Sequence, residues 1–326
     1  MKTNYMINKK ALVTIVIPCY NHESYVQKAI QSVIDQDYDN IEFIIIDDGS
    51  KDNSVAKIEE MIPACQKRFR RFEFRHRINK GLPKTLNEGL KWAKGDFFSP
   101  VASDDILLNH KVTTLLNAWN KNKNLEVIFG DANFIDMQAN KIKLNIKNSV
   151  KVYNMDVDNF LLYHTINRFD YRDKKKFGSY ETILENNYLP AMSCIIKTES
   201  LVNEGGWDSN YNIEDWQMWL SLSKKSQFFL VDEVVSSYRI HGKNSFDLIG
   251  DKLNYDAYFL LASQKNYAIS NGYKDIFYRN LAKRIYSLKK ISRVIFFKEF
   301  LFNLNSSSFI KNISFDLALR VLKKYK

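Results

Sequence analysis

The chain alternates short apolar runs with longer segments in which apolar residues recur every three or four positions. The runs at 12–17 and 41–46 are rich in β-branched residues, which is typical of buried strands in a parallel sheet. A segment with helical spacing follows each run, over 22–35 and 53–67. Strands that alternate with helices of this length indicate an α/β fold with a mostly parallel sheet and right-handed crossovers.

The same alternation continues along the chain. We expect strands over 71–76, 97–101, 125–129, 188–196, 228–231 (as an edge strand) and 234–241, and helices over 81–94, 109–120 and from 213 onward. Gly95 follows the helix at 81–94, where glycine is favoured just after a helix end. The segment 136–176 lacks clear periodicity, and a long insert of this kind is often a lid or an acceptor loop.

Three of the expected strands end in residues that can carry chemistry: Pro18-Cys19-Tyr20-Asn21, Asp47-Asp48-Gly49-Ser50 and Ser103-Asp104-Asp105. The carboxyl ends of parallel strands meet at one edge of a sheet, where ligands bind in open α/β folds. Two adjacent carboxylates repel each other, and a divalent cation that holds a phosphate-bearing substrate would neutralise them. Alternatively, Ser-Asp-Asp is a surface turn that caps the following helix.

A third acid, Asp215, begins a helix and shares one face of it with Met218, Trp219 and Leu222. Apolar neighbours raise the pKa of a carboxyl, while the helix N-terminus lowers it, and the balance suits a general base. The alternative is that Asp215 simply caps the helix. His241 stands alone in a loop, where a histidine is usually solvated, but imidazole is also a good ligand for a Mn²⁺-like ion.

Composition and charge restrict the class of protein. The apolar content of 45% and charged content of 26% are ordinary for a globular protein, and three widely spaced cysteines favour a reducing compartment. The apolar run near the N-terminus is too short for a signal peptide, and no apolar stretch approaches the ~20 residues that span a bilayer. We therefore expect a cytoplasmic protein.

The net charge of +11 is concentrated at the C-terminus, where residues 279–326 hold twelve Lys or Arg and two acids. We expect a catalytic domain over 1–245 and a basic helical region over 246–326. Because the body is nearly neutral, it is not expected to bind nucleic acid. Apolar stripes lie beside these basic residues: Leu281, Ile285, Leu288 and Ile295, then Phe315, Ala318, Leu319 and Leu322. Such helices dock on anionic membrane surfaces, here the inner face of the plasma membrane, or pack on the catalytic domain or a second subunit.

The sequence contains neither G-x-G-x-x-G after the first strand nor G-x-x-x-x-G-K-[ST], which argues against the Rossmann dinucleotide and P-loop sites. Its ordered motifs over 12–242 instead resemble family-2 inverting glycosyltransferases, which have the GT-A fold of nucleotide-diphospho-sugar transferases. The matching motifs are Val16-Ile17-Pro18-Cys19-Tyr20-Asn21, Ile46-Asp47-Asp48-Gly49-Ser50-Lys51-Asp52, Asn79-Lys80-Gly81 with Asn87-Glu88-Gly89, Gly95-Asp96 with Ser103-Asp104-Asp105, and Gly205-Gly206-Trp207-Asp208 with Glu214-Asp215.

The resemblance implies a role for each matching residue. Asp48 would hydrogen-bond the base of the donor, in a pocket lined by Pro18, Tyr20 and the adjacent Asn21. Asp104 would contact the ribose, and Asp105 would bind a divalent metal (Mn²⁺ or Mg²⁺) with His241 as a further ligand. Asp215 would deprotonate the acceptor. Lys84 would neutralise phosphate, although a solvated helix surface also explains it, and Ser103 replaces the first acid of the family's D-x-D pattern.

The resemblance implies transfer of a sugar from a nucleoside-diphosphate donor, UDP-linked in our expectation, to a hydroxyl of a glycan or polyprenyl-linked acceptor in bacterial surface polysaccharide synthesis. A sugar-nucleotide nucleotidyltransferase is the alternative enzyme, but it would show a Gly- and Lys/Arg-rich loop after the first strand. A catalytically inactive glycan-binding or scaffold module is the alternative from another class. Assembly into a homo-oligomer is left open.

Overall fold

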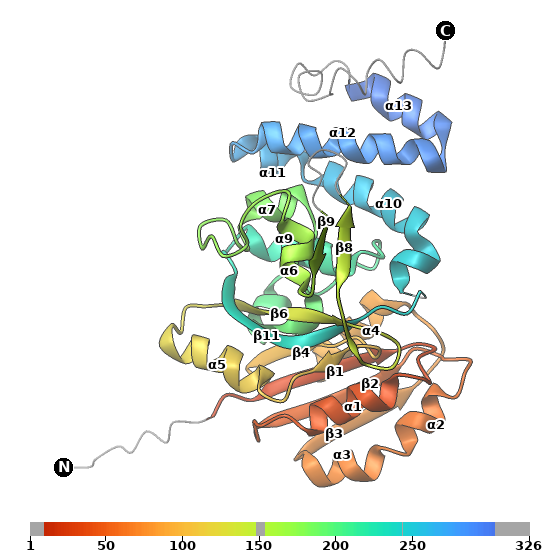
Figure 1. Cartoon of the computed structure of the whole chain (residues 1–326), viewed down its shortest axis with the longest axis vertical. Coiled ribbons are helices and arrows are strands. Elements are labelled where there is room, and N and C mark those ends of the chain that lie inside the picture. The colour runs from red at the N-terminus through yellow and green to blue at the C-terminus, as the bar shows by residue number, and fades with distance from the viewer. Residues whose placement is uncertain (1–9, 148–153, 243, 304–326) are drawn as a thin grey trace, which may run out of the picture.

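One mixed sheet runs through the molecule in the order β3-β2-β1-β4-β10-β6-β11-β5, with β7 paired to β6 (Figure 1). The structure is a computed structural model and describes residues 10–147, 154–242 and 244–303. The strands are β1 (Val13–Cys19), β2 (Ile41–Asp47), β3 (Arg71–His76), β4 (Phe97–Pro100), β5 (Ile106–Leu107), β6 (Val127–Ile135), β7 (Lys141–Ile142), β10 (Cys194–Lys197) and β11 (Phe229–Arg239), and a separate ribbon of β8 (Leu144–Lys147) and β9 (Asn154–Val157).

The first four strands form one parallel group of the sheet, and β6 and β11 form a second parallel pair. β1 pairs with β2 from Val13↔Ile41 to Cys19↔Asp47, β2 pairs with β3, and β4 lies on the other side of β1. β2 is buried along its whole length and β1 along most of it, which explains the continuous apolar runs. Because these strands are parallel, the segments that follow them emerge at one edge, as the sequence predicts.

Helices flank the sheet and continue beyond it (Figure 1). They are α1 (Val26–Ile34), α2 (Ser54–Glu59), α3 (Ile62–Arg68), α4 (Leu82–Trp92), α5 (Lys111–Lys121), α6 (Phe160–Thr165), α7 (Tyr180–Glu185), α8 (Thr198–Asn203), α9 (Glu214–Ser223), α10 (Ser245–Ser263), α11 (Lys265–Ser270), α12 (Lys274–Ile291) and α13 (Arg293–Asn303), with a 3₁₀ turn η1 (Ala191–Ser193). The α/β class with a mostly parallel sheet and C-terminal helices is confirmed.

Two expected helical features differ in the structure. The helix expected over 53–67 is split into α2 and α3, because Pro63 occupies the first turn of α3, where proline starts a helix well but cannot continue one. Gly95 is not a cap residue of α4. A Cβ at this position would lie 2.5 Å from Thr14 Oγ1, so close packing against β1 requires the glycine.

The strands of the second half also differ from expectation. The segment 188–196 is strand only at its end, where β10 runs antiparallel between β4 and β6. The expected strands at 228–231 and 234–241 are one interior strand, β11, because β6 is nine residues long and pairs with both parts across a register shift. The irregular segment 136–176 contains β7, β8, β9 and α6.

The C-terminal helices pack on the catalytic part of the chain. Leu281, Ile285 and Leu288 are buried in the same cluster as Trp216 and Trp219. This apolar stripe is therefore a packing face, one of the alternatives left open by the sequence, and it is not available to a membrane. The Ile295 side chain and the second stripe at 315–322 lie outside the described residues, and the boundary at 245 stays a prediction.

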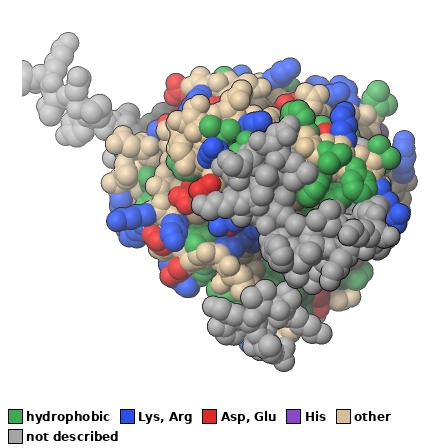
Figure 2. Space-filling model, turned by 90° about the horizontal axis from the view of Figure 1, so that it is seen from above, with side chains coloured by type: hydrophobic (Ala, Val, Ile, Leu, Met, Phe, Trp, Pro, Cys, Tyr) green, Lys and Arg blue, Asp and Glu red, His purple; other side chains and the backbone are tan. Residues whose placement is uncertain are grey.

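The outer face of these helices exposes other apolar side chains, namely Val294, Leu301 and Phe302 of α13. Figure 2 looks onto this end of the molecule and shows hydrophobic side chains next to Lys and Arg. Within the described ranges, we find no helix with the length and hydropathy that crossing a membrane requires.

Candidate active site

The acid pair follows β4 and is buried: Ser103 is 2% exposed, Asp104 8% and Asp105 2%. The Asp104 carboxylate faces two histidines. Its Oδ2 lies 2.9 Å from His241 Nε2 and 3.9 Å from His22 Nε2. Ser103 Oγ lies 2.7 Å from His22 Nδ1 and so orients that imidazole ring. Segments after β1, β4 and β11 therefore contribute to one cluster.

Three of these side chains could hold a metal ion. Ligand atoms of His22, Asp104 and His241 all lie within 4.8 Å of one another. Burial tends to raise the pKa of Asp104, but the hydrogen bond from His241 and the charge of the histidines outweigh it, and the pKa is lowered. An ionised carboxylate with two imidazoles is a suitable donor set for Mn²⁺-like ions. These residues fit a divalent cation.

Neighbouring side chains hold His241 in place. The His241 ring stacks on Tyr25, with 4.9 Å between the ring centroids and 28° between the planes. The guanidinium of Arg239 also lies over the Tyr25 ring, 5.0 Å from its centroid. The backbone N–H of His241 donates to Asn244 Oδ1 at 3.2 Å. A ligand whose orientation is determined by packing in this way is pre-organised.

Asp105, which the resemblance assigns to the metal, is placed differently. Its Oδ1 accepts the backbone N–H of Arg239 at 2.9 Å, and Arg239 Nε donates to the Asp104 carbonyl at 2.7 Å. Burial first, and then the Asp104 charge, raise the pKa of Asp105 well above its usual value, against the opposing effect of Arg239. In this structure Asp104, and not Asp105, is the carboxylate beside the histidines. Asp105 instead ties the segment after β4 to β11, and its metal role stays a prediction.

The residues predicted to bind the donor lie on the loops after β1 and β2. Asn21 has a φ of 55°, its Oδ1 accepts the Lys51 N–H at 2.7 Å, and its own N–H donates to Ser50 Oγ at 2.8 Å. These bonds tie the two loops together. Beside them Tyr20 is 46% exposed and Pro18 is half-buried, so both are accessible.

Asp48 supports the loop that follows β3. Its carboxylate pairs with Arg77 and accepts the backbone N–H groups of Lys80 and Gly81 at 2.7 and 2.9 Å. The base contact predicted for Asp48 would have to be made by a carboxylate that already organises this loop. Lys84 is exposed on α4, as the solvated-surface interpretation expects.

Asp215 lies in the first turn of α9. The N-cap of this helix is Ile213, so Asp215 does not cap it. Its Oδ2 accepts from Asn187 Nδ2 at 2.8 Å and its Oδ1 from the Trp216 N–H at 2.7 Å. Burial raises its pKa against these hydrogen bonds, and burial together with the Asp215 charge raises the pKa of Glu214 to about 8. The raised pKa agrees with the expectation for a general base.

Tyr238 connects the two acidic regions. This half-buried side chain on β11 has a raised pKa, first because of burial and then because of the nearby charges of Asp105, Asp104 and Asp215. The charges of all three carboxylates act on the Tyr238 phenol. The acid pair and Asp215 therefore lie in the same region of the fold, although more than a hundred positions separate them in the sequence.

Sequence reasoning missed three residues of the site: His22, Arg239 and Asn187. His22 could have been found, because it stands four positions after Pro18 in a segment already expected at the ligand-binding edge. Arg239 and Asn187 have no comparable signal, since each acts by contacting an acid distant in the sequence.

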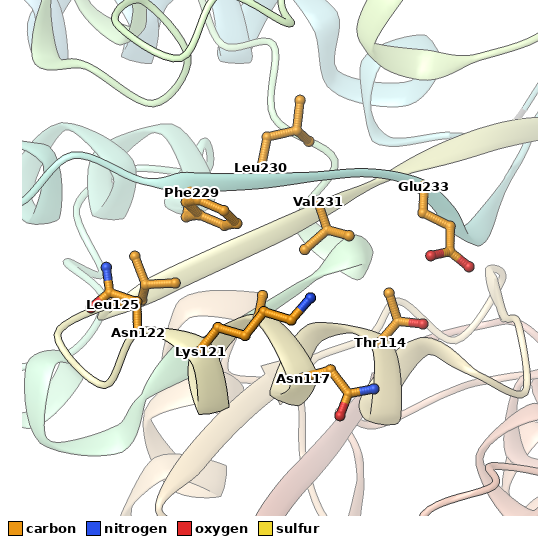
Figure 3. Close-up of a pocket in the computed structure, with 10 residues that line it drawn as sticks. Thr114, Asn117, Lys121, Asn122, Leu125, Phe229, Leu230, Val231 and Glu233 are labelled. Atoms are coloured by element: carbon orange, nitrogen blue, oxygen red, sulfur yellow. The ribbon is translucent and has the colours of Figure 1, made fainter.

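The described residues also form a shallow cavity of about 390 Å³ away from the acids. It lies between α5 and β11, with Lys121, Asn117 and Thr114 on one side and Phe229, Val231 and Glu233 on the other (Figure 3). None of the predicted site residues lines it. We therefore assign the site from the side-chain chemistry and not from this cavity.

Solved structures with a similar fold include S. aureus TarS 1-349 in complex with UDP-GlcNAc, with a TM-score of 0.59 and 15% identity over 87% of this chain and 74% of that one. The mannosyltransferase PcManGT from Pyrobaculum calidifontis, in complex with GDP-Man and Mn²⁺, has a TM-score of 0.58 and 12% identity over 98% of this chain and 80% of that one. At these identities the likeness shows a shared fold.

In sequence, the chain is similar to an uncharacterized glycosyltransferase from Haemophilus influenzae, with 31% identity over 235 residues, or 72% of this chain and 81% of that relative. It is 36% identical over 133 residues to an uncharacterized glycosyltransferase from Rickettsia felis, a match that covers 40% of this chain and 21% of the relative's length. The family model described as Glycosyl transferase family 2 matches residues 14–180, more than half of the chain. The chain therefore belongs to glycosyl transferase family 2.

Proposed function

We propose that the protein is a metal-dependent inverting glycosyltransferase, which transfers a sugar from a nucleoside-diphosphate donor to a hydroxyl of its acceptor. The observation that carries this proposal is the buried Asp104 between His22 and His241, in the same region as Asp215. Membership in family 2 supports it, as do the UDP-GlcNAc and GDP-Man bound by proteins of similar fold. UDP is the nucleotide we expect, from the resemblance noted above.

The donor would lie across the edge formed by the loops after β1, β2 and β4. His22, Asp104 and His241 would hold the divalent ion, Mn²⁺ or Mg²⁺, and Asp105 stays a candidate in this role. When bound, such an ion supplies positive charge that stabilises the diphosphate leaving group. Pro18, Tyr20 and Asn21 would line the base pocket with Asp48, and Lys84 and Ser103 would lie near the phosphates and ribose.

Asp215 would act as the general base on the acceptor hydroxyl. Burial and the charge of Asp215 raise the pKa of its neighbour Glu214, which favours Asp215 as the ionised member of the pair. Deprotonation of the acceptor oxygen by Asp215 promotes its attack on the anomeric carbon from the face opposite the diphosphate, and the configuration inverts.

A donor panel tests this function. The full chain is incubated with UDP-, dTDP- and GDP-sugars in the presence of Mn²⁺, Mg²⁺ or EDTA, and release of the nucleoside diphosphate is measured. We expect release from one nucleotide class, with UDP first, and loss of release in EDTA. Formation of a sugar nucleotide from a sugar 1-phosphate and a nucleoside triphosphate would instead indicate a nucleotidyltransferase.

The acceptor we propose is a glycan or polyprenyl-linked sugar in bacterial surface polysaccharide synthesis, reached at the inner face of the plasma membrane. The exposed Val294, Leu301 and Phe302 of α13, with Arg293 and Lys298 also exposed, support peripheral docking. Co-sedimentation of the chain with anionic liposomes, compared with the Leu301→Asp and Phe302→Asp variants, tests this; equal binding by all three would exclude docking through this face.

A further inference from the structure

A second cavity, of about 660 Å³, lies between the catalytic part of the chain and the C-terminal helices. Its wall includes β8 and six side chains from α6, the segment after it, α7 and α12: Tyr163, His164, Asn167, Arg168, Glu185 and Lys283. None of the residues assigned to the donor lines it. Its size is in the range of sites that bind small molecules or parts of larger ones.

Positive charge dominates this wall. Arg168 and Lys283 line the cavity, and Arg279 and Arg284 lie on the same helix as Lys283, close enough to act on its charge. Burial and the charge of Arg168 lower the pKa of Arg284 to about 10. Among the residues that line this cavity, Glu185 is the one with a carboxylate. Arg279 Nη2 lies 3.8 Å from Glu185 Oε1. Two cations, Arg168 and Lys283, thus line the cavity, and Arg279 and Arg284 lie near them.

Two links connect the surroundings of the cavity to the proposed base. Glu185 of its wall precedes Asn187 by two residues, and Asn187 donates to Asp215. The Arg284 guanidinium stacks over Trp216, the residue after Asp215, at 4.9 Å from the ring centroid. The residues that flank the cavity are therefore connected to the residues that contact or adjoin Asp215.

Aromatic contacts lead from the cavity to the acid pair. The ring of Phe160 packs against His164 of the wall, 4.3 Å between centroids, and against Tyr238, 5.4 Å between centroids. Tyr238 is the side chain that senses the charges of Asp104, Asp105 and Asp215. A series of aromatic contacts therefore runs from the cavity wall to Tyr238, which lies near these acids.

We propose that this cavity binds a phosphate group of the acceptor, so that the enzyme glycosylates a phosphate-bearing molecule. Arginine and lysine bind phosphate through charge-assisted hydrogen bonds, and Arg168 and Lys283 are both accessible to a ligand in this cavity. The proposal rests on the proposed function, because it assigns the molecule in the cavity to the acceptor. The phosphate has two possible sources, a phosphodiester within a glycan or the diphosphate of a polyprenyl carrier.

Direct binding tests the site. The full chain is titrated calorimetrically in EDTA with dimethyl phosphate, which represents the diester, and with farnesyl diphosphate, which represents the lipid carrier. We expect one of the two to bind, and Arg168→Ala and Lys283→Ala each to weaken binding at least tenfold. Lys274→Ala removes an exposed lysine of the same helix that does not line the cavity and should bind as the wild type does.

The two probes distinguish the sources, since the stronger ligand identifies the diester or the lipid diphosphate. Lys283 is exposed, so Lys283→Ala should fold normally, which the melting temperature checks. Binding that is unchanged in both cavity variants, or no binding of either probe, would overturn the proposal.

Hydrolysis of the sugar nucleotide without acceptor separates this proposal from the proposed function. Arg168→Ala and Lys283→Ala should hydrolyse the donor at the wild-type rate in Mn²⁺, because neither residue lies at the donor edge. If the wild type hydrolyses no donor but still binds phosphate through Arg168 and Lys283, the proposed function fails and the anion site remains.

Discussion

The two halves of the sheet use their polar residues differently. In the half built from β1 to β4, Asp47 and Asp48 accept backbone N–H groups of nearby loops. In the half built around β6, β10 and β11, the described residues include buried polar atoms with no hydrogen-bond partner: both amide atoms of Asn133, Oδ1 of Asn187 and Nη2 of Arg239. An unsatisfied buried polar atom costs about 1–3 kcal/mol. In the first half, Asp47 and Asp48 thus hold their own loops in place. In the second half, Asn187 and Arg239, which contact the acids, retain unused hydrogen-bonding atoms.

Asp215→Asn tests whether the second half supplies the chemistry. We expect turnover to fall by about 10²–10⁴-fold, the usual range for loss of a general base, because the amide cannot accept the acceptor proton. Donor affinity, measured calorimetrically with a UDP-sugar and Mn²⁺, should stay within about threefold of wild type, since the proposed function assigns donor binding to the first half. Turnover within a few-fold of wild type would remove Asp215 from the mechanism.

The first half of the fold could be predicted from the sequence because its elements obey local rules. Buried parallel strands such as β1 and β2 need continuous apolar runs, whereas the edge strand β3 alternates apolar and polar residues. All three begin and end within two residues of the expected positions. The second half depends on distant pairing. β11 is an interior strand only because β6 extends beside it. β10 lies between β4 and β6 and pairs with residues that precede it by more than 60 positions. Such pairing leaves little trace in local periodicity.

The site follows the same division. Loop residues after buried strands, such as Asp104 and Asn21, could be named in advance from their position. Which acid faces the histidines could not, because it depends on Arg239, whose backbone N–H engages Asp105. Asn187 likewise becomes important only through its contact with Asp215 in the folded chain.

A buried lysine lies where the two halves of the sheet meet, at the junction of β4 and β10. Lys111 is fully buried, and its Nζ donates to Ser99 Oγ at 2.7 Å, while Ser99 donates to the Cys194 carbonyl at 2.9 Å. Burial lowers the pKa of Lys111 from 10.5 to about 8. Between pH 8 and 10.5 the unfolded state binds more protons, so the free energy of unfolding should rise with pH in this window, by about 3 kcal/mol at most.

Lys111→Met isolates this effect. The difference in unfolding free energy between the wild type and this variant, from urea titrations at pH 7.5, 9 and 10.5, should increase with pH in favour of the wild type. Subtraction is needed because the buried thiols have raised pKa values and lower the stability above pH 9. Lys121→Met, at the exposed end of α5, serves as the control. A difference that does not change with pH would show that Lys111 stays charged when folded.

The His22→Ala variant tests whether the first half of the sheet contributes a metal ligand in addition to the proposed ligand Asp104. Mn²⁺ affinity, measured by electron paramagnetic resonance without donor, should fall by about 10–100-fold, the loss typical of residues that support a metal site. His110→Ala, at the start of α5 and outside the cluster, should bind Mn²⁺ as the wild type does. Unchanged affinity in His22→Ala would leave His22 as a partner of Ser103 only.

Asn187→Ala is expected to have the smallest effect and sharpens the comparison most, because it leaves every acid in place. The Asn187 amide donates to Asp215 and lowers its pKa, so its removal should raise that pKa and shift the acidic limb of the kcat profile to higher pH. At neutral pH we expect kcat to fall about tenfold or less, with KM for the sugar donor unchanged, since the proposed donor site lies on the other half of the sheet. Asn187→Asp replaces the hydrogen-bonding amide with a second carboxylate. This change should move the acidic limb of the kcat profile to still higher pH. A loss of kcat without any shift of the profile would mean that Asn187 only supports the fold near α9, and that the polar groups of the second half are structural like those of the first.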